Sequence, residues 1–348
     1  MLILYLLILI AVLWGLGIRK EPSLEAALST EQSTMLKGVF VMLVFTSHVG
    51  GYLVLDPTTG LLTKGYLSLQ ARIGQLVVLP FLFYSGYGLR CSIEKKGKPY
   101  LRSLPSRRVL RIYLHAFLII TVFLIVTLML GARYTPMQLL TGYLLLGSFG
   151  NSTWYIFAII CLYLFTWFSF TVFRKPGAAL CSCFLLTLGY YLIFASFSSV
   201  WWYDTVFVFW FGLIFPYFLP LLRRALDRGA LLWVCLLLLL GGAILLLTYS
   251  LKGLPHGIAE NLRAILAMLF LLLLLERVRF GNRVLFWVGR HVFEFYMLQR
   301  LPMILLSHFG FNHSAPLFFV CASIAGTAAL VYLFGKLLRC FDRLVFRA

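Results

Sequence analysis

The chain has 348 residues, 62% of them hydrophobic and 12% charged, and apolar runs long enough to cross a membrane recur from end to end. This composition excludes a soluble globular protein and predicts an all-α, polytopic integral membrane helical bundle. A net charge of +19 would favour nucleic acid in a soluble protein, but here the basic residues form short clusters between apolar runs, where topology and anionic lipid account for them. We therefore expect the lipid bilayer as a partner and no nucleic acid.

The apolar runs predict about eleven spanning helices. The expected spans are residues 2–18, 36–54, 73–91, 109–131, 154–173, 177–198, 203–222, 231–250, 258–276, 283–308 and 315–337. The first run has no basic segment before it and no cleavage site after it, so residues 1–20 are predicted to be an additional N-terminal transmembrane helix. Residues 134–148 are apolar but too short to cross, which predicts a re-entrant or interfacial segment.

Basic residues are concentrated in alternate connections between the predicted spans. By the positive-inside rule, this asymmetry places the N-terminus outside and the C-terminus in the cytoplasm, with residues 341–348 as a basic cytoplasmic tail. No eukaryotic targeting signal is visible, which favours a bacterial inner (plasma) membrane. The seven cysteines have no metal-ligand spacing, so no metal site is expected. Asp204, Glu260 and Arg263 lie near the ends of predicted spans, where single charges are usually solvated.

One apolar segment carries two polar residues, Lys37 and His48, eleven positions apart. In a helix they lie about 16 Å apart along the axis and, after nearly three turns, on nearly the same face. A titratable imidazole at membrane depth is costly unless it faces a cavity or a polar neighbour. His48 is therefore a candidate catalytic residue, and a histidine that only packs against a neighbouring helix is the alternative.

A basic run from residue 91 to residue 111 leads into the next predicted span. Arg107, Arg108 and Arg111 begin that span, and Arg107 and Arg111 share a helix face. Guanidinium groups bind phosphate oxygens through planar forks, which suits a phosphorylated donor such as a coenzyme A ester. The alternative is an ordinary positive-inside anchor.

Three further segments place polar groups among apolar ones. Residues 81–88 contain Tyr84 and Ser85 beside glycines, which favours close helix packing or a ligand against the backbone. Residues 151–155 contain Trp154, typical of an interfacial belt or a sugar platform. Residues 287–302 carry charged and polar groups in an otherwise apolar span, which indicates either a lined cavity or an ion-pair network. The cavity residues expected there are Arg290, Glu294, Tyr296 and Gln299, with ion pairs from Glu294 to Arg290 or Arg300.

In their order and spacing these segments resemble the membrane-bound acyltransferase family 3, whose members move acyl groups onto envelope or exported glycans. The family's Arg, ten residues and His resemble Lys37 to His48, and its aromatic-Ser-Gly segment resembles residues 81–87. Its basic run resembles residues 107–111. Its Trp-aromatic signature resembles residues 154–156, and its late Gly-Arg segment resembles residues 289–299. Two departures are Lys37, where the family has arginine, and Gln299, where it has a second histidine.

The resemblance implies an O-acetyltransferase domain at residues 30–340. Acetyl-CoA or another acyl-CoA would bind from the cytoplasm as donor, and the acceptor would be a hydroxyl of an envelope or exported polysaccharide. His48 would act as general base or transient acyl carrier. Residues expected to hold the donor are Lys37, Arg107, Arg108 and Arg111, and those expected to shape the substrate cavity are Tyr84, Ser85, Trp154, Arg290, Glu294, Tyr296 and Gln299.

Two other functions stay open from the sequence alone. A transporter or flippase for a glycan or a lipid-linked sugar would also place charged groups near the middle of the membrane, although such proteins often show repeated halves, which are not visible here. A sensor or scaffold without catalysis would tolerate the loss of His48. The effect of His48→Ala on acetylation and on export separates the three.

Overall fold

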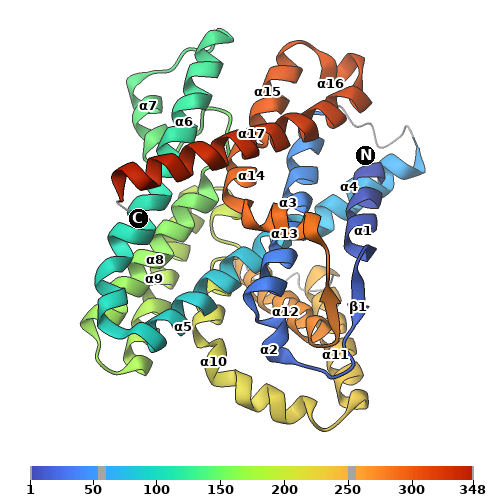
Figure 1. The fold of residues 1–348 in the computed structure, drawn as a ribbon, viewed down its shortest axis with the longest axis vertical. Helices are drawn as coiled ribbons and strands as arrows, with labels where there is room; N and C mark the ends of the chain where they lie inside the picture. The colour runs from blue at the N-terminus through green and yellow to red at the C-terminus, as the bar shows by residue number, and fades with distance from the viewer. Residues whose placement is uncertain (1, 54–59, 250–255, 347–348) are drawn as a thin grey trace.

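The computed structural model describes residues 2–53, 60–249 and 256–346. The ends of the expected spans 36–54 and 231–250, and the last residues of the expected tail 341–348, lie outside these ranges. The described chain is helical almost throughout (Figure 1), which confirms the predicted fold class. Its longer helices are α1 (Leu2–Leu13), α3 (Thr30–Gly50), α4 (Leu61–Ile73), α5 (Leu79–Leu104), α6 (Arg111–Met129), α8 (Trp154–Val172), α9 (Pro176–Phe197), α10 (Phe207–Leu226), α11 (Ala230–Tyr249), α12 (His256–Arg277) and α17 (Pro316–Val345).

Shorter elements connect these helices. They are α2 (Leu24–Ala27), α7 (Pro136–Tyr143), α13 (Arg283–Arg290), α14 (Val292–Leu298), α15 (Arg300–His308), α16 (Phe311–Ser314), the 3-10 turns η1 (Gly74–Val78) and η3 (Val200–Trp202), the π-helix η2 (Pro105–Leu110), and the strands β1 (Leu16–Ile18) and β2 (Val278–Phe280). Helix α7 has eight residues, or about 12 Å. It is too short to span a bilayer, as predicted for residues 134–148.

Eight helical stretches of the described chain are long and apolar enough to cross a membrane, and they cover nine of the eleven expected spans. One of them, residues 63–129, contains two of those spans because α5, η2 and α6 follow one another without a loop. The basic segment expected to be a connection is therefore helical. It bends at Gly97, whose φ is +60°, and Pro99 cannot donate a backbone hydrogen bond beyond the bend.

The other two expected spans, residues 2–18 and 283–308, are not continuous helices in the structure. The first helix ends at Leu13 instead of residue 18, and β1 then pairs antiparallel with β2, with Gly17 opposite Arg279. The span expected at 283–308 is broken into α13, α14 and α15. His291 leaves helical geometry with φ −113° and ψ 28°. Pro302 cannot donate to the Leu298 carbonyl, which weakens the helix at the second break.

Glycine pairs set the closest helix contacts. A Cβ added at Gly38 of α3 would strike the Leu285 carbonyl of α13, and one at Gly289 would strike the Thr34 carbonyl. Gly86 of α5 and Gly212 of α10 approach the opposing backbones in the same way, so the packing alternative for residues 81–88 is confirmed. Small residues allow this approach between helices in a bilayer. The two contacts fix α3 and α5 in the bundle.

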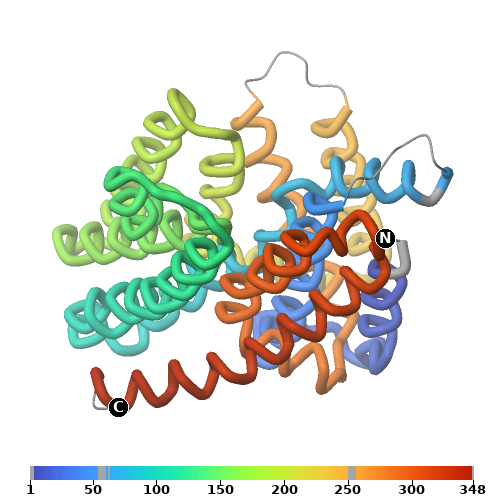
Figure 2. Tube along the Cα trace, turned by 90° about the horizontal axis from the view of Figure 1, so that it is seen from above, coloured from blue at the N-terminus to red at the C-terminus, as the bar shows by residue number. Residues whose placement is uncertain are grey.

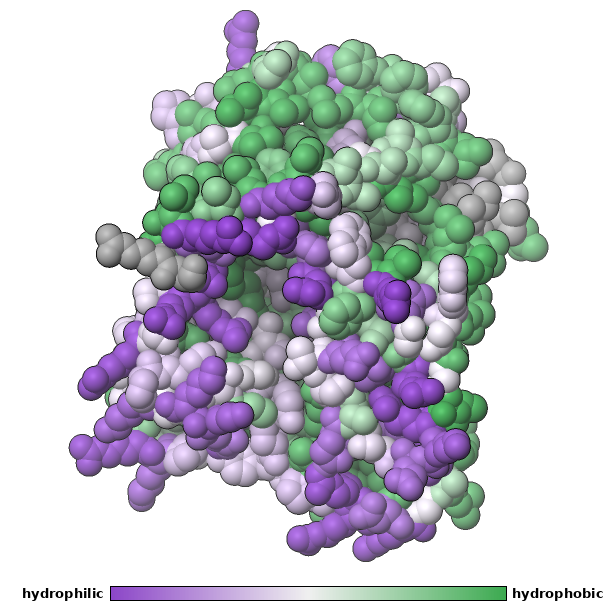
Figure 3. All heavy atoms as spheres, viewed as in Figure 1, coloured by the Kyte–Doolittle hydropathy of each residue, from purple (hydrophilic) through white to green (hydrophobic). Residues whose placement is uncertain are grey.

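Viewed from above, α6 to α9 form one side of the bundle, and α1, α3, α4, α11 and α12 form the other (Figure 2). Helix α17 crosses the bundle at a steep angle to α3 (Figure 1). Hydrophilic side chains gather over the lower half of the face in Figure 3, and mainly hydrophobic ones cover the upper half. We call the hydrophilic end the basic end; α5 and the end of α10 run into it (Figure 1), and with η2 they carry Lys95, Lys96, Arg107 and Arg223.

Candidate active site

Helix α3 carries both Lys37 and His48 and runs from the basic end into the bundle. Its first turn is capped by Ser29, whose hydroxyl accepts a hydrogen bond of 3.3 Å from the backbone N–H of Gln32. The Gly38 and Gly289 contacts described above hold it against α13. The two predicted site residues therefore sit on one rigid element, about 16 Å apart along its axis.

His48 is partly buried and stands among aromatic side chains. Its ring centroid is 6.5 Å from that of Tyr296 in α14. The Tyr296 hydroxyl lies 3.0 Å from the Ser152 hydroxyl, and its ring packs edge-on against Tyr155. Within the described part of the chain, no hydrogen-bond partner reaches the buried Nδ1 of His48. A packing histidine normally satisfies such an atom, so Nδ1 of His48 is an unsatisfied polar atom inside the bundle.

Further polar atoms without partners belong to residues that are linked to Tyr296 and Arg300. Across the described ranges, Nδ2 of Asn151, Oε1 of Gln299 and Nε of Arg300 are buried and unbonded. Arg300 lies close enough to His48 for their charges to interact. Its guanidinium also stacks 5.7 Å from the ring of Tyr52, one helical turn beyond His48. Each unsatisfied polar group is costly when buried, so these atoms are candidate contacts for a ligand.

Lys37 lies at the basic end of this site. Its ammonium is within electrostatic range of Arg108, which sits beside the hydroxyls of Tyr100 and Tyr163. Arg107 and Arg108 line a cavity of about 500 Å³ together with Lys96, Tyr100 and Ser103. The structure thus brings three of the four predicted donor-binding cations to one region.

The fourth predicted cation, Arg111, has a partner inside the protein. Its Nε is 3.5 Å from a carboxylate oxygen of Asp342 in α17, and its guanidinium stacks on Phe346 at 4.9 Å. The Nε2 of His115 lies 2.8 Å from the same carboxylate oxygen. Arg111 and His115 therefore tie α6 to α17.

The ion pairs expected for Glu294 do not form in the described chain. Neither Arg290 nor Arg300 approaches it within 4 Å, and Arg290 is exposed, with its guanidinium 5.9 Å from the Phe286 ring. The break at His291 removes the continuous helix on which that expectation rested. Tyr296 lies beside His48, and Gln299 donates a hydrogen bond to the Tyr296 carbonyl, whereas Arg290 belongs to α13, before the break.

The remaining predicted cavity residues have different environments. Tyr84 is buried and donates a hydrogen bond of 3.1 Å to the carbonyl of Ala27, so its hydroxyl joins α5 to α2. Ser85 lies beside the hydroxyl of Tyr155, which faces Tyr296. Trp154 begins α8 and packs edge-on against Tyr155 at 5.8 Å. Ser85 and Trp154 are thus connected to the His48 region through Tyr155.

The sequence did not single out Asn151, Ser152 and Tyr52 as site residues. Asn151 and Ser152 were assigned to an interfacial belt, but they are 1% and 8% exposed and face the bundle interior. Their signal was a polar run directly before Trp154, which marks a buried turn as well as an interface. Arg300 is one of the polar groups that indicate a lined cavity at residues 287–302, but it is not among the predicted site residues.

These features define a polytopic helical membrane protein with an unsatisfied polar site in its interior. A family model described as an acyltransferase domain matches residues 32–335, so the chain belongs to the acyltransferase 3 family. No curated protein and no solved structure matches the chain. The resemblance found in the sequence is confirmed, and the protein is a membrane-embedded acyltransferase.

Proposed function

We propose that this protein transfers an acyl group, in the simplest case acetyl, from acyl-CoA to a hydroxyl of an envelope or exported polysaccharide. The observation that carries the proposal is the course of α3. At the basic end, its Lys37 lies near Arg108 and the cavity of about 500 Å³. Deeper in the bundle, its His48 presents an unbonded ring nitrogen.

The donor would bind at the basic end with its phosphates against Lys37, Arg107 and Arg108. Phosphate oxygens suit a cluster of cations on α3 and η2. By the positive-inside rule this end faces the cytoplasm, where acyl-CoA is made, which puts the N-terminus outside. The acyl end of the donor would then reach inward along α3 toward His48.

The acceptor would enter from the opposite end. A cavity of about 330 Å³ opens there, lined by Tyr52, Thr127, Ile304, Ser307 and His308 among others. Its Tyr52 ring stacks with Arg300, so the cavity borders the polar groups around His48. Aromatic and hydroxyl side chains of this kind suit a sugar. Donor and acceptor would thus meet at His48 from opposite ends of the bundle.

In the simplest mechanism His48 acts as a general base. It takes the proton of the acceptor hydroxyl while the hydroxyl oxygen attacks the thioester carbonyl carbon. The C–S bond then breaks, and the departing thiolate takes the proton from the imidazolium. In the two-step alternative the imidazole takes the acyl group first and passes it to the acceptor hydroxyl.

The test is acyl transfer by purified protein in proteoliposomes, with labelled acetyl-CoA on the basic side and a polysaccharide acceptor on the other. Wild type should label the glycan. His48→Ala should reduce the rate at least about 100-fold, the size expected for a general base, while exposed His313→Ala should match wild type. Undiminished labelling by His48→Ala contradicts the assignment of His48, and glycan export without labelling supports a transporter.

A second measurement separates the base from the carrier. Wild type is incubated with labelled acetyl-CoA in the absence of acceptor and then denatured. Label that stays on the wild-type chain, is absent from His48→Ala and is released by hydroxylamine supports the acyl carrier. An unlabelled chain from a preparation that transfers acetyl supports the general base.

A further inference from the structure

Arg300, the first residue of α15, is partly buried, and its guanidinium lacks some of its hydrogen-bond partners. In the described chain no carboxylate lies within 4 Å of it. One terminal nitrogen makes a long hydrogen bond of 3.4 Å to the carbonyl of Asn151, and Nε is buried without a partner. A guanidinium is rarely placed inside a membrane protein without a counter-charge unless a ligand supplies one.

Asn151 presents a second free donor in the same place. It is 1% exposed, and its side-chain oxygen accepts a hydrogen bond of 3.0 Å from the backbone N–H of Phe149. That bond fixes which way the amide faces, because the oxygen must point to Phe149. The NH₂ group therefore points away from Phe149, and no partner reaches it among the described residues.

Both donors are held close to His48. Arg300 lies within electrostatic range of His48, and Asn151 adjoins Ser152, whose hydroxyl lies 3.0 Å from that of Tyr296 beside the imidazole. Two unbonded N–H donors beside an unbonded ring nitrogen match the needs of acyl transfer. The nitrogen takes a proton, and the donors receive the negative charge that develops on the carbonyl oxygen.

We propose that Arg300 and Asn151 bind the oxyanion of the tetrahedral intermediate, a catalytic role that rests on the proposed acyl transfer. When the acceptor oxygen bonds to the thioester carbon, the C=O double bond becomes a single bond and its electron pair moves onto oxygen. Nε of Arg300 and Nδ2 of Asn151 donate to that oxygen. When the double bond re-forms, the C–S bond breaks and the thiolate takes the proton held by His48.

The same residues could instead bind an acidic group of the acceptor in its ground state. The two roles differ in kinetics. An oxyanion donor acts mainly in the transition state, so its loss lowers kcat and leaves KM nearly unchanged. A donor to the acceptor's own carboxylate or phosphate acts in both states, so its loss raises KM for the acceptor.

The experiment measures kcat and KM for acetyl-CoA and acceptor in proteoliposomes of wild type, Arg300→Gln, Arg300→Lys and Asn151→Asp. We expect Arg300→Gln to lower kcat about 10²- to 10³-fold with KM values within about twofold. Arg300→Lys keeps the charge but loses the forked Nε–H, and we expect a loss of about tenfold or more. Asn151→Asp keeps the acceptor for Phe149 and removes the donor, and its kcat should fall about 10²-fold. Exposed Arg228→Gln is the matched control and should equal wild type.

Each outcome decides the proposal. Wild-type kcat in Arg300→Lys and Asn151→Asp overturns it, and so does an increase confined to KM for the acceptor. If Arg300→Gln does not fold, Arg300→Lys with a wild-type unfolding transition still decides. An active wild type, an inactive His48→Ala and an unimpaired Arg300→Lys reject only this inference. A wild type that transfers no acyl group to any hydroxyl acceptor rejects the proposed function itself.

Discussion

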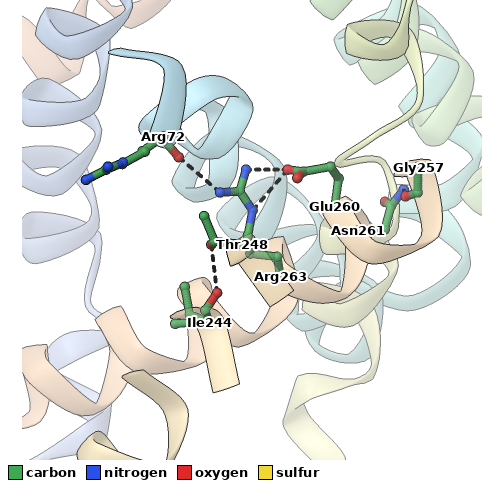
Figure 4. Close-up of polar contacts among 7 residues, drawn as sticks. All are labelled: Arg72, Ile244, Thr248, Gly257, Glu260, Asn261 and Arg263. Carbon is green, nitrogen blue, oxygen red and sulfur yellow. Dashed lines mark hydrogen bonds and ion pairs between the residues drawn. The ribbon is translucent and has the colours of Figure 1, made fainter. Parts of the chain in front are cut away.

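Two arginines inside the bundle, Arg263 and Arg300, have opposite surroundings. Arg263 of α12 is 6% exposed, and its fork is filled by the Glu260 carboxylate and by the carbonyl of Arg72, which accepts at 3.0 Å (Figure 4). Arg300 has one long contact and an unbonded Nε. A buried charge that the chain neutralises itself serves the fold, whereas one that it leaves open can bind a ligand, as we propose for Arg300.

Two asparagines repeat the contrast. The Asn261 amide donates bonds of 2.8 Å to the carbonyls of Tyr203 and Gly257, and its oxygen accepts from the N–H of Phe207. The amide of Asn151 is used only on its oxygen side. The region around Arg263 therefore joins α12 to its neighbours, and the region around His48 keeps its donors free. This comparison predicts where a substitution affects stability and where it affects catalysis.

The largest predicted effect is the loss of stability in Arg263→Ala. The substitution leaves Glu260, whose side chain is 16% exposed, without its counter-charge, and removal of one partner of a buried pair costs about 3–5 kcal/mol. Arg300→Ala should cost less than about 1 kcal/mol, because no carboxylate of the described chain depends on it. Unfolding of the purified variants in mixed micelles by added SDS measures both.

The double variant Arg263→Ala with Glu260→Ala is the control for this prediction. Removing both charges should restore part of the stability, since no unpaired carboxylate remains. Equal losses of stability in Arg263→Ala and Arg300→Ala would contradict the difference between the region around Arg263, whose polar groups have partners, and the region around His48, whose donors are free.

The next largest effect is expected from Gly289→Ala. This substitution tests whether the packing of α13 against α3 is needed to position the region around His48. The new Cβ would strike the Thr34 carbonyl and push α13 from α3, so we expect a loss of about 1–3 kcal/mol together with reduced transfer, because His48 sits on α3. Gly242→Ala, a glycine with open space around it, is the matched control and should be neutral or slightly stabilising. A wild-type rate and stability in Gly289→Ala would show that this contact does not position the site.

The fold class could be predicted from the sequence, and so could the placement of Lys37 and His48 on one helix. Long apolar runs force backbone hydrogen bonds to close within helices, so most spans followed from hydropathy. Lys37 and His48 followed from a helical spacing within one element. The breaks at His291 and Gln299 could not be predicted in the same way, because the segment 283–308 is apolar enough for a continuous span and tertiary contacts decide its course.

The sequence also could not predict which residue each charged side chain contacts. The prediction that Asp204 and Arg263 are solvated near span ends is wrong, because they are 3% and 6% exposed. Arg111 was grouped with Arg108 by adjacency, yet it contacts Asp342, more than 200 positions away. Residue type indicates that a charge needs a partner, but only the packing of α6 against α17 selects which one.

A smaller effect is expected from Asn261→Ala. The substitution leaves the Tyr203 carbonyl and the Phe207 N–H without their partner, which costs about 1–3 kcal/mol without a direct effect on kcat. Asn151→Asp, in contrast, keeps the bond from Phe149 and places its new carboxylate near Arg300, so we expect kcat to fall by more than the loss of stability explains. Unfolding transitions and kcat measured on the same preparations separate the two. Loss of kcat in a folded Asn261→Ala would extend the functional region to α12.

The smallest effect concerns Arg111. It is paired within the chain, like Arg263, but it also lies next to the residues proposed to bind the donor. Its partner Asp342 is about one-fifth exposed, so the pair contributes little to stability, about 1 kcal/mol or less. If Arg111 also contacts the donor phosphates, Asp342→Asn releases it and lowers KM for acetyl-CoA about two- to fivefold, the equivalent of that energy. Measuring KM in Asp342→Asn and in Arg111→Gln distinguishes the roles. A KM unchanged in both variants makes Arg111 a structural residue like Arg263, whereas opposite shifts place it with Lys37 and Arg108 in the donor site.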